Sequence, residues 1–581
     1  MTPAAANPRT GVAIAFVGSG GAGALTTGNM LLEAACAAGL HGLLTRTLGP
    51  QIRGGEAAAL LRLAGRPVEC AADRLDLLIG IDWLNAERFG AELKVDSATL
   101  VIGDPEGAEP PPAVTGSGAR LITLPLTEMA KAVEGGRPNM VALGLAGRLL
   151  GFDIEQLSAV VADHLAEKGP AAIAASRSGI EIGFAAAEGI EFAPRLATPQ
   201  SRSSRRWLLS GNEATGLGAV RGGIRFAAAY PITPATEILE WLAPNLAKVG
   251  GLLLQAEDEL AAINMIVGAS YGGTPSLTAT SGPGLSLMVE ALGLATSAEV
   301  PIVVVDVMRG GPSTGIPTKS EQADLNIAVY GMHGDAPHLV LAPQSVGDCL
   351  FTTQWATYLA EALQAPALVL SDQFMGQSRT SIERPADLAF VGKRTVAAQG
   401  AAPYKRYALA AGGVSPMAIP GTPGCQYTAD GLTHTETGTP TSGAAHHLAQ
   451  LDKRRDKLDG FDYGNHWATI EGPGEGQAET AVLTWGSLTG AAREACERLA
   501  ADGIAVRLVS PRLLLPTRPN EMAAALAGVK RILVVEQTHG AQFLRYLRAH
   551  YDFPVPLEAL NRPGPLPITA GEICRALRKG R

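Results

Sequence analysis

The hydrophobic residues of this chain are grouped in short runs that alternate with glycine-rich turns and helical segments. The first run, "GVAIAFVG", leads through the turn "SGGAG" into a stretch of small residues. A buried strand followed by a tight turn and a helix is the beginning of a doubly wound α/β sheet. Further apolar runs, "LDLLIGID" and "TLVIG", indicate that this first unit continues to about residue 195.

The same alternation predicts two more α/β units, over residues 212–395 and 476–581. In the second unit the apolar runs are continuous, which is typical of a mostly parallel sheet. Residues 196–211 are polar and basic and are expected to form a linker. Residues 396–475 are rich in Gly, Pro, Thr and His without a sustained period, and predict a long irregular connection laid over a neighbouring surface. The expected fold class is therefore α/β with three doubly wound, Rossmann-like units.

Composition and charge narrow the class of protein. A chain of 581 residues with 46% hydrophobic and 18% charged residues can bury large cores and is not expected to be disordered. The net charge of −8 gives no support for a nucleic acid or an anionic membrane as partner. The apolar run near the start is too short and too glycine-broken for a signal peptide or a membrane span. We expect a soluble, cytoplasmic protein.

The cysteines and histidines do not predict a metal site. No C-x-x-C pair is present, and the spacings fit neither zinc nor an iron–sulfur cluster. The histidines are not spaced as metal ligands either. Isolated reduced thiols of a cytoplasmic protein are the expected state of the six cysteines, which are Cys36, Cys70, Cys349, Cys425, Cys496 and Cys574.

Two features of the first unit are candidates for ligand binding. The loop "GSGGAG" precedes a helix and can place backbone N–H groups around a phosphate, although close strand–helix packing is the commoner reason for such glycines. A nicotinamide dinucleotide site would also need an acidic residue at the end of the next strand, where this chain has the basic "HGLLTRT". Arg53 follows on a loop expected at the carboxyl edge of the sheet, either as a ligand contact or as a solvated side chain.

In the second unit, the turn "YPITP" places Thr233 between Pro231 and Pro234, directly after Tyr230. Prolines on both sides prevent regular structure and stiffen the approach to the helix that follows. The turn is either a rigid strand-to-helix connection or a device that presents Thr233 to a bound molecule.

Two other loops of this unit have the same strand–turn–helix geometry. Glu257, Asp258 and Glu259 stand at a helix start, where acids complement the helix dipole but where a catalytic carboxylate is also placed. In the next loop, Ser281 and Gly282 belong to the sequence "SGPG", whose short residues permit the close approach of a ligand or of another backbone.

A fourth loop carries the cations. A buried strand ends at Arg309, and a Gly/Ser/Thr-rich loop leads through Thr318 to Lys319. Such a loop suits a carboxylate or a phosphate, since arginine offers a two-pronged donor. Because the carboxyl ends of parallel strands meet at one edge of a sheet, Thr233, Glu259, Ser281 and Arg309 are expected to converge. Together they predict an enzyme site for a small anionic substrate.

These motifs resemble a known family in their order and spacing. "YPITP", "EDELAAINMIVGAS", "TATSGPGLSLM" and "RGGPSTGIPTKSEQADL" are similar to the α subunit of 2-oxoacid:ferredoxin oxidoreductases, most closely the 2-oxoglutarate synthase type. The N-terminal "VGSGGAG…RTLGPQIRGGE" resembles the family's γ domain, here fused ahead of the α part. The resemblance implies a γ domain over residues 1–195, a thiamine pyrimidine-binding domain over 212–395, and a transketolase C-terminal-like domain over 476–581.

The resemblance also implies a thiamine diphosphate site shared with a β subunit. Glu259, with Glu257 as the alternative, would contact the aminopyrimidine ring, and Mg²⁺, the diphosphate and a 4Fe-4S cluster would be held by the β subunit. The chain has no continuous acidic diphosphate motif and no cluster cysteines, which fits this division. The other cofactor contacts implied are Tyr230, Pro231, Ser281 and Gly282. The substrate contacts implied are Arg53, Thr233, Arg309, Thr318 and Lys319.

The implied reaction is the oxidative decarboxylation of 2-oxoglutarate with coenzyme A to succinyl-CoA, CO₂ and reduced ferredoxin, reversible in principle. An (αβ)₂ assembly is expected, because interfaces of this kind usually close by two-fold symmetry. Many relatives have Lys where this chain has Arg53, so activity on pyruvate or on a broad range of 2-oxoacids is a competing hypothesis. A ferredoxin-independent thiamine decarboxylase, a non-catalytic partner and a nicotinamide-linked dehydrogenase are three further competing hypotheses.

Overall fold

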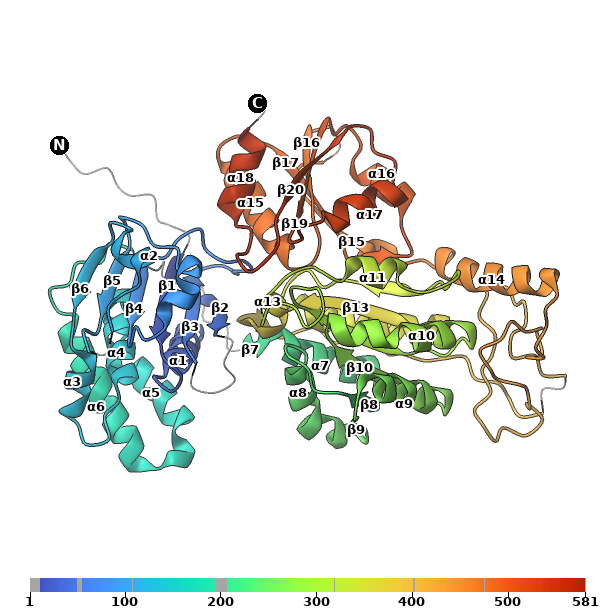
Figure 1. The fold of residues 1–581 in the computed structure, drawn as a ribbon, viewed down its shortest axis with the longest axis horizontal. Helices are drawn as coiled ribbons and strands as arrows, with labels where there is room; N and C mark the ends of the chain where they lie inside the picture. Colours follow the sequence, from blue (N-terminus) through green and yellow to red (C-terminus); the bar gives the residue numbers. More distant parts are fainter. Residues whose placement is uncertain are drawn as a thin grey trace. The chain divides into compact units, whose positions relative to one another are not determined.

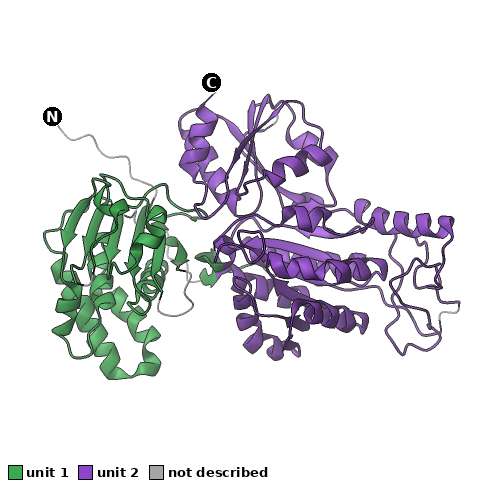
Figure 2. Ribbon diagram, in the orientation of Figure 1, with its two compact units in different colours: residues 1–209, 377–386 green, residues 210–376, 387–581 purple. Residues whose placement is uncertain are grey.

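The computed structural model describes residues 11–49, 55–106, 108–194, 196, 206–317, 319–400, 403–474 and 476–579. The chain forms two compact units, shown in different colours in Figure 2. The first comprises Met1–Leu209 with Gln377–Ala386, and the second comprises Ser210–Gly376 with Asp387–Arg581. No helix in the described part of the chain is both long and apolar enough to cross a bilayer.

The first unit is built on an eight-stranded sheet with the order β6-β5-β4-β1-β3-β2-β14-β7 (Figure 1). β1 is parallel to β4, and parallel pairing continues to β5 and β6, whereas β3 and β2 are antiparallel to their neighbours. The sheet is therefore mixed, with the predicted βα beginning at its centre. Its strands are β1 (Val12–Gly18), β2 (His41–Leu48), β3 (Ala57–Ala64), β4 (Leu77–Gly80), β5 (Leu100–Gly103), β6 (Arg120–Thr123), β7 (Arg206–Ser210) and β14 (Arg379–Glu383). Its helices are α1 (Ala24–Ala37), α2 (Pro112–Thr115), α3 (Leu126–Lys131), α4 (Pro138–Leu150), α5 (Ile154–His164) and α6 (Pro170–Ala186).

The predicted boundaries differ from the structure at β7 and β14. The second domain was expected to be continuous over residues 212–395, but residues 377–386 belong to the first unit, where β14 pairs antiparallel with β2. The expected linker over residues 196–211 ends in β7, which occupies the outer edge of the same sheet. An exposed strand edge presents unpaired N–H and C=O groups. β14 satisfies those of β2, and β7 pairs in turn with β14. Such pairing joins residues far apart in sequence, so no local pattern predicts it.

The second unit contains a seven-stranded sheet with the order β18-β12-β13-β11-β10-β8-β9, in which β18 is Leu513–Leu515. The strands from β12 to β9 are parallel, and their central members are almost completely buried, as the continuous apolar runs predict. The strands are β8 (Phe226–Ala229), β9 (Leu252–Gln255), β10 (Ser276–Thr280), β11 (Val303–Met308), β12 (Leu339–Leu341) and β13 (Ala367–Asp372). The helices are α7 (Gly211–Gly222), α8 (Thr236–Leu246), α9 (Glu259–Tyr271), α10 (Gly282–Ser297), α11 (Leu325–Tyr330), α12 (Asp348–Leu363) and α13 (Gln373–Gln377).

The C-terminal segment forms a five-stranded sheet with the order β15-β17-β16-β19-β20. It shares one unit with the preceding sheet, because β18 leaves it and pairs antiparallel with β12. Its strands are β15 (Ala468–Glu471), β16 (Thr480–Leu483), β17 (Val506–Pro511), β19 (Arg531–Glu536) and β20 (Leu557–Asn561), and β18 is Leu513–Leu515. The helices are α15 (Thr489–Ala501), α16 (Pro519–Ala525), α17 (Gln542–His550) and α18 (Ala570–Arg578).

The connection over residues 396–475 is more regular than the sequence predicts. It ends in the 16-residue helix α14 (Ala444–Asp459) and in strand β15. The glycines and prolines that suppress a local period lie mostly before α14, in a segment that is irregular as expected.

A buried charge cluster around Glu299 holds this connection in place. The Glu299 carboxylate is fully buried just after α10, and it accepts hydrogen bonds from Lys453 Nζ at 2.5 Å and Lys457 Nζ at 2.8 Å, both on α14. Arg406 Nη2 donates to the Glu299 carbonyl oxygen at 2.8 Å, and Lys457 Nζ also donates to the carbonyl oxygen of Gln364, the C-cap of α12, at 2.9 Å. The cations therefore also satisfy carbonyl groups at two helix C-termini, where positive charge is favoured.

Replacing Glu299 by Gln is expected to lower the free energy of unfolding by about 3–5 kcal/mol, because it leaves two buried lysines without their carboxylate. Urea denaturation followed by circular dichroism measures the change. Asp452→Asn is the matched control, since it removes an exposed ion pair with Arg455 on the same helix and should cost less than about 1 kcal/mol. If the two substitutions lowered the free energy of unfolding equally, the Glu299 cluster would not be what holds the connection in place.

Candidate functional site

Four loops that follow parallel strands meet at the carboxyl edge of the seven-stranded sheet. Thr233 follows β8, Glu259 follows β9, Ser281 follows β10 and Arg309 follows β11. These strands are neighbours in the order β11-β10-β8-β9, so the convergence expected from the sequence is present in the structure. The carboxyl edge of a parallel sheet is where α/β proteins bind their ligands.

The turn with Thr233 is held from two sides. Arg309 Nη1 donates to the carbonyl oxygen of Thr233 at 2.7 Å, and Asn212 Nδ2 donates to that of Pro234 at 2.9 Å. Thr233 and Tyr230 remain exposed, while Pro234 is buried. The turn is thus both rigid and open to a bound molecule, so the two interpretations of this sequence are compatible.

The three acids before α9 have different environments. Glu257 and Asp258 are exposed, and Asp258 caps the helix by accepting from the backbone N–H of Ala261 at 2.7 Å. Glu259 is buried against the start of α10, where a Cβ added at Gly284 would lie 2.7 Å from its Oε1 atom. The acid that is buried at the ligand edge is therefore Glu259, and Gly284 leaves it room.

The first turn of α10 is lined by small residues and an unpaired hydroxyl. Ser281 is fully buried, and its Oγ atom has no hydrogen-bond partner among the described residues. A Cβ at Gly282 would lie 2.7 Å from both carboxyl oxygens of Asp324. Any side chain at Gly282 would therefore displace Asp324, which ties this glycine to the loop after Arg309.

That loop is anchored to the C-terminal sheet by Gln322, a residue that sequence reasoning missed. Gln322 is fully buried, and its Nε2 atom donates to the carbonyl oxygen of Trp485 at 2.8 Å. Its Oε1 atom accepts from the backbone N–H of Gln537 at 2.8 Å. Lys319 lies in the same loop, where its carbonyl oxygen accepts from the backbone N–H of Gly310 at 2.9 Å. Thr318 lies outside the described residues.

Sequence reasoning also missed two acids near Arg309. Asp306 is fully buried in the middle of β11, and Asp324 is the N-cap residue of α11. Burial and the neighbouring Asp324 raise the pKa of Asp306 well above its usual range, while burial raises the pKa of Asp324 to about 6. A charged residue inside the apolar run "VVVDVM" is the signal that would have identified Asp306. Burial lowers the pKa of Arg309, although Asp324 opposes this effect.

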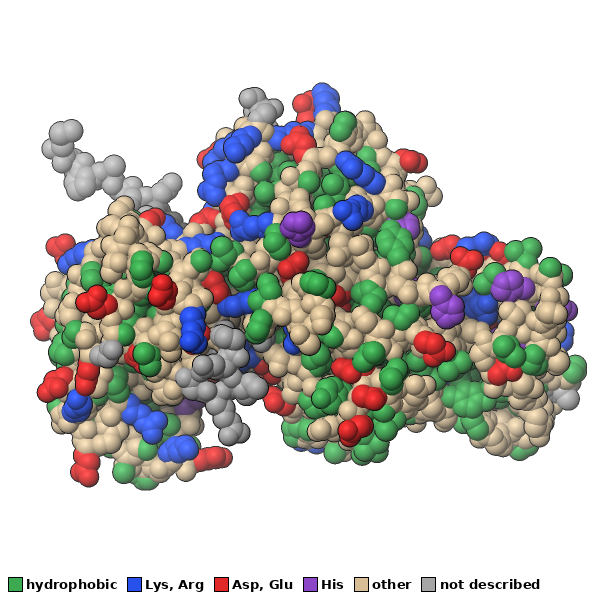
Figure 3. Space-filling view, in the orientation of Figure 1, with side chains coloured by type: hydrophobic (Ala, Val, Ile, Leu, Met, Phe, Trp, Pro, Cys, Tyr) green, Lys and Arg blue, Asp and Glu red, His purple; other side chains and the backbone are tan. Residues whose placement is uncertain are grey.

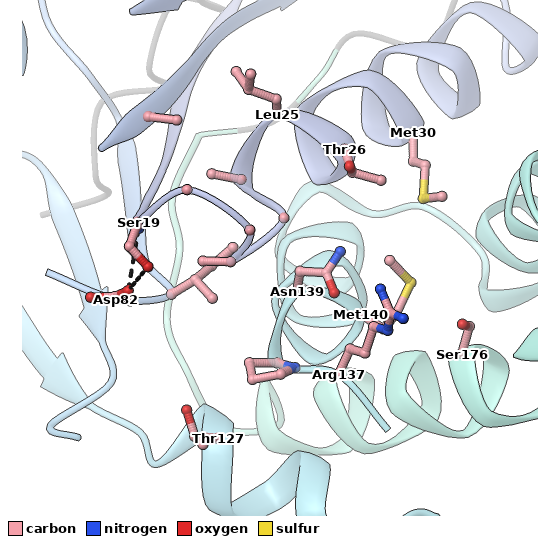
Figure 4. Close-up of a pocket in the computed structure, with 18 of the residues that line it drawn as sticks. Ser19, Leu25, Thr26, Met30, Asp82, Thr127, Arg137, Asn139, Met140 and Ser176 are labelled. Atoms are coloured by element: carbon pink, nitrogen blue, oxygen red, sulfur yellow. Dashed lines mark hydrogen bonds between the residues drawn. The ribbon is translucent and has the colours of Figure 1, made fainter. Parts of the chain in front are cut away.

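The first unit has a separate cavity of about 1390 Å³ beside the glycine loop (Figure 4). The loop enters α1 through Gly23, whose φ of 87° favours glycine, and Ser19 Oγ donates to Asp82. Arg137, Asn139 and Lys168 line the cavity together with the first turn of α1. The first N–H groups of a helix have no intrahelical partners, so this end of the cavity can accept an anion. Arg53 lies outside the described residues.

Comparison with known families gives three matches along the chain. Residues 13–186 match the family described as pyruvate ferredoxin/flavodoxin oxidoreductase. Residues 217–453 match its thiamine diphosphate-binding family, and residues 474–554 match the transketolase C-terminal domain.

Individual relatives agree with these matches. The chain is 32% identical to the α subunit of 2-oxoacid:ferredoxin oxidoreductase 1 from Sulfurisphaera tokodaii, over 72% of this chain and 67% of that one. It is 34% identical to the 2-oxoglutarate oxidoreductase subunit KorA from Mycobacterium tuberculosis, over 76% and 68% of the two chains. A solved structure of 2-oxoglutarate:ferredoxin oxidoreductase from Magnetococcus marinus, with 2-oxoglutarate, coenzyme A and succinyl-CoA bound, superimposes with a TM-score of 0.90. It is 36% identical and covers 98% of this chain and 99% of that one.

The close contact between Gly284 and Glu259 leads to a prediction about stability. Gly284→Ala is expected to lower the free energy of unfolding by about 1–3 kcal/mol, since the new Cβ would lie 2.0 Å from Thr280 Oγ1 and 2.7 Å from Glu259 Oε1. The control is Gly268→Ala in α9, where an added Cβ would meet no atom within 4 Å. Because alanine has a higher helix propensity than glycine, this substitution should stabilise the protein by about 1 kcal/mol. Urea denaturation compares the two variants. A Gly284→Ala protein as stable as the unsubstituted chain would show that the space beside Glu259 is not restricted.

Proposed function

This chain belongs to the 2-oxoacid:ferredoxin oxidoreductases as an α subunit, and from that membership we propose that it acts with a β subunit in the CoA-dependent oxidative decarboxylation of 2-oxoglutarate. The observation that carries the proposal is the buried Glu259 beside Gly284, at the same sheet edge as the Arg309–Thr233 contact. Similarity to the Magnetococcus marinus enzyme over nearly the whole chain supports 2-oxoglutarate as the substrate. The Sulfurisphaera tokodaii relative is named for 2-oxoacids in general, so the alternative is activity on pyruvate or on a broad range of 2-oxoacids.

The residues around Glu259 fit the aminopyrimidine part of thiamine diphosphate. Glu259 offers a buried carboxylate, Gly282 and Gly284 leave space beside it, and Ser281 Oγ is buried without a partner in the described part of the chain. A polar ring can satisfy such groups, which otherwise lose free energy on burial. We propose that Tyr230 and Pro231 border the same site. When bound, the cofactor supplies the electron sink that decarboxylation of a 2-oxoacid needs.

In the proposed reaction, the residues of this chain have separate roles toward the cofactor and the substrate. Glu259 would hold the pyrimidine ring of the bound cofactor through a hydrogen bond at which its buried carboxylate can act as a general acid or base. Arg309 and Lys319 bind the substrate carboxylate. Thr233, in the turn that Arg309 holds at Thr233 and Asn212 holds at Pro234, orients it. Arg53 and Thr318 remain predictions from the sequence for the same role.

An exposed apolar face gives the β subunit a place to bind. Leu252 and Leu254 on the edge strand β9, Leu260 and Met265 on α9, and Leu287 on α10 are each 40–53% exposed. Hydrophobic side chains gather around β9 and α9 in Figure 3, interspersed with acidic ones. Contiguous exposed apolar residues mark interaction surfaces. We propose that the β subunit covers this face and brings Mg²⁺ and the 4Fe-4S cluster, that the assembly is (αβ)₂ in the cytoplasm, and that ferredoxin accepts the electrons.

The assignment of Glu259 is tested by a pair of isosteric substitutions. Glu259→Gln is expected to lower kcat for 2-oxoglutarate-dependent viologen reduction by at least about 100-fold, because the buried carboxylate is lost. Glu257→Gln should leave kcat within about twofold, since that side chain is exposed. Both are measured on the complex with its β subunit, under argon and with CoA. If Glu257→Gln lowers kcat more than Glu259→Gln, the role belongs to Glu257. If the complex reduces the dye with pyruvate but not with 2-oxoglutarate, the proposed substrate is wrong.

We further propose that the cavity of the first unit binds coenzyme A. Its volume of about 1390 Å³ suits a large ligand, and the start of α1 with Arg137 and Lys168 suits the phosphate groups. The Magnetococcus marinus enzyme, which covers this unit as well, has coenzyme A bound.

Reversing the charge at Arg137 is expected to raise the KM for CoA about tenfold or more, since a charge-assisted contact with phosphate is replaced by repulsion. The KM for 2-oxoglutarate should stay the same. Arg148→Glu is the control, because Arg148 is exposed at the other end of α4 and does not line the cavity. An unchanged KM for CoA in Arg137→Glu would place coenzyme A elsewhere.

A further inference from the structure

Two carboxyl groups beside Arg309, that of the fully buried Asp306 and that of the half-buried Asp324, lack enough hydrogen-bond donors among the described residues. Asp306 comes from β11 and Asp324 from the N-terminus of α11, and the two carboxyl groups lie within hydrogen-bonding range of each other. Both oxygens of Asp306 and the Oδ2 atom of Asp324 are buried and have no donor in the described part of the chain. Two adjacent carboxylates in this environment would lack donors and repel each other.

A single proton between the two groups resolves both problems. A protonated Asp306 can donate to Asp324, which gives each carboxyl group a partner and reduces the charge of the pair to −1. The raised pKa of Asp306 agrees with this arrangement. The remaining charge lies on Asp324, whose carboxyl group also faces the side chain of Glu321 and the guanidinium of Arg309.

We propose that Asp306 and Asp324 share one proton, and that the charge left on Asp324 weakens the hold of Arg309 on a substrate carboxylate. The second half rests on the proposed function, in which Arg309 binds that carboxylate. Asp324 is then a residue that tunes affinity through Arg309 and does not itself touch the substrate. Its position against Gly282 keeps it beside the site.

The charge arrangement couples substrate binding to proton uptake. Asp324, with a pKa of about 6, is ionised above that pH and neutral below it. An anion bound at Arg309 repels the ionised form, so binding raises the pKa of Asp324 and draws in a proton near pH ~6.5. Anion affinity therefore falls as the pH rises through this range. Replacing Asp324 by Asn removes the charge at every pH.

The shared proton is tested without any ligand. A protonated Asp306 has a folded pKa above its unfolded value, so its contribution to stability is lost as the pH rises. Asn is neutral in both states, so the Tm of Asp306→Asn relative to the unsubstituted chain should increase between about pH 5 and pH 8. Asp452→Asn, at an exposed site, should show no such trend. A flat difference for Asp306→Asn would show that Asp306 is ionised in the folded protein and overturn the shared proton.

The effect on the anion is tested with glutarate, a dicarboxylate that cannot react, by titration calorimetry of the αβ complex in buffers of different ionisation enthalpy. The unsubstituted complex should take up about half a proton per site near pH ~6.5. Asp324→Asn should take up none, and at about pH 8 it should bind glutarate about tenfold more tightly than the unsubstituted complex. Equal proton uptake or equal affinity in the two proteins would overturn the role of Asp324.

Arg309→Met separates failure of this inference from failure of the proposed function. If Arg309→Met loses glutarate binding while Asp324→Asn behaves like the unsubstituted complex, only the role of Asp324 is wrong. If Arg309→Met binds glutarate normally, Arg309 is not the carboxylate site, and both the proposed substrate contact and the role of Asp324 fall. The stability test of the shared proton stands apart from both results.

Discussion

Parallel pairing of β9, β8, β10 and β11 is the constraint on which the candidate site depends. Parallel strands point the same way, so the loops after them must meet at one edge, and these loops carry Glu259, Thr233, Ser281 and Arg309. The central strands are buried on both faces and close-packed against the helices that cover them, which makes them rigid. The rigid sheet thus supplies precise positions for side chains that lie on short loops.

Buried charges have different environments at the amino edge and at the carboxyl edge of this sheet. At the amino ends of β11 and β13, both carboxylate oxygens of Glu299 accept from lysines, and Lys457 and Arg406 also donate to carbonyl groups at helix C-termini, so the Glu299 cluster is structural. At the carboxyl edge, Asp306 and Asp324 are placed together and short of donors among the described residues. Removing one member of a buried charge pair is strongly destabilising, whereas incompletely satisfied buried groups change their protonation and are concentrated at functional sites.

The C-terminal sheet contributes to the site by holding a loop that belongs to another sheet. Gln322 is hydrogen-bonded to Trp485 and Gln537, and β18 extends the seven-stranded sheet. The loop between Arg309 and Asp324 is therefore fixed at both ends, by β11 and by the C-terminal segment. This explains physically why the second and third predicted α/β segments form one compact unit.

The sequence by itself determined the strand–turn–helix alternation, the four loops and their common edge, because these follow from local periodicity and from the rule for parallel strands. The tertiary structure alone decided that Glu259 is buried while Glu257 is exposed, since this depends on Gly284, which lies on a different helix. It also decided that β14 joins the first sheet and that Asp306 meets Asp324. Each of these contacts joins residues from different elements, and burial and pKa depend on those neighbours rather than on the local sequence.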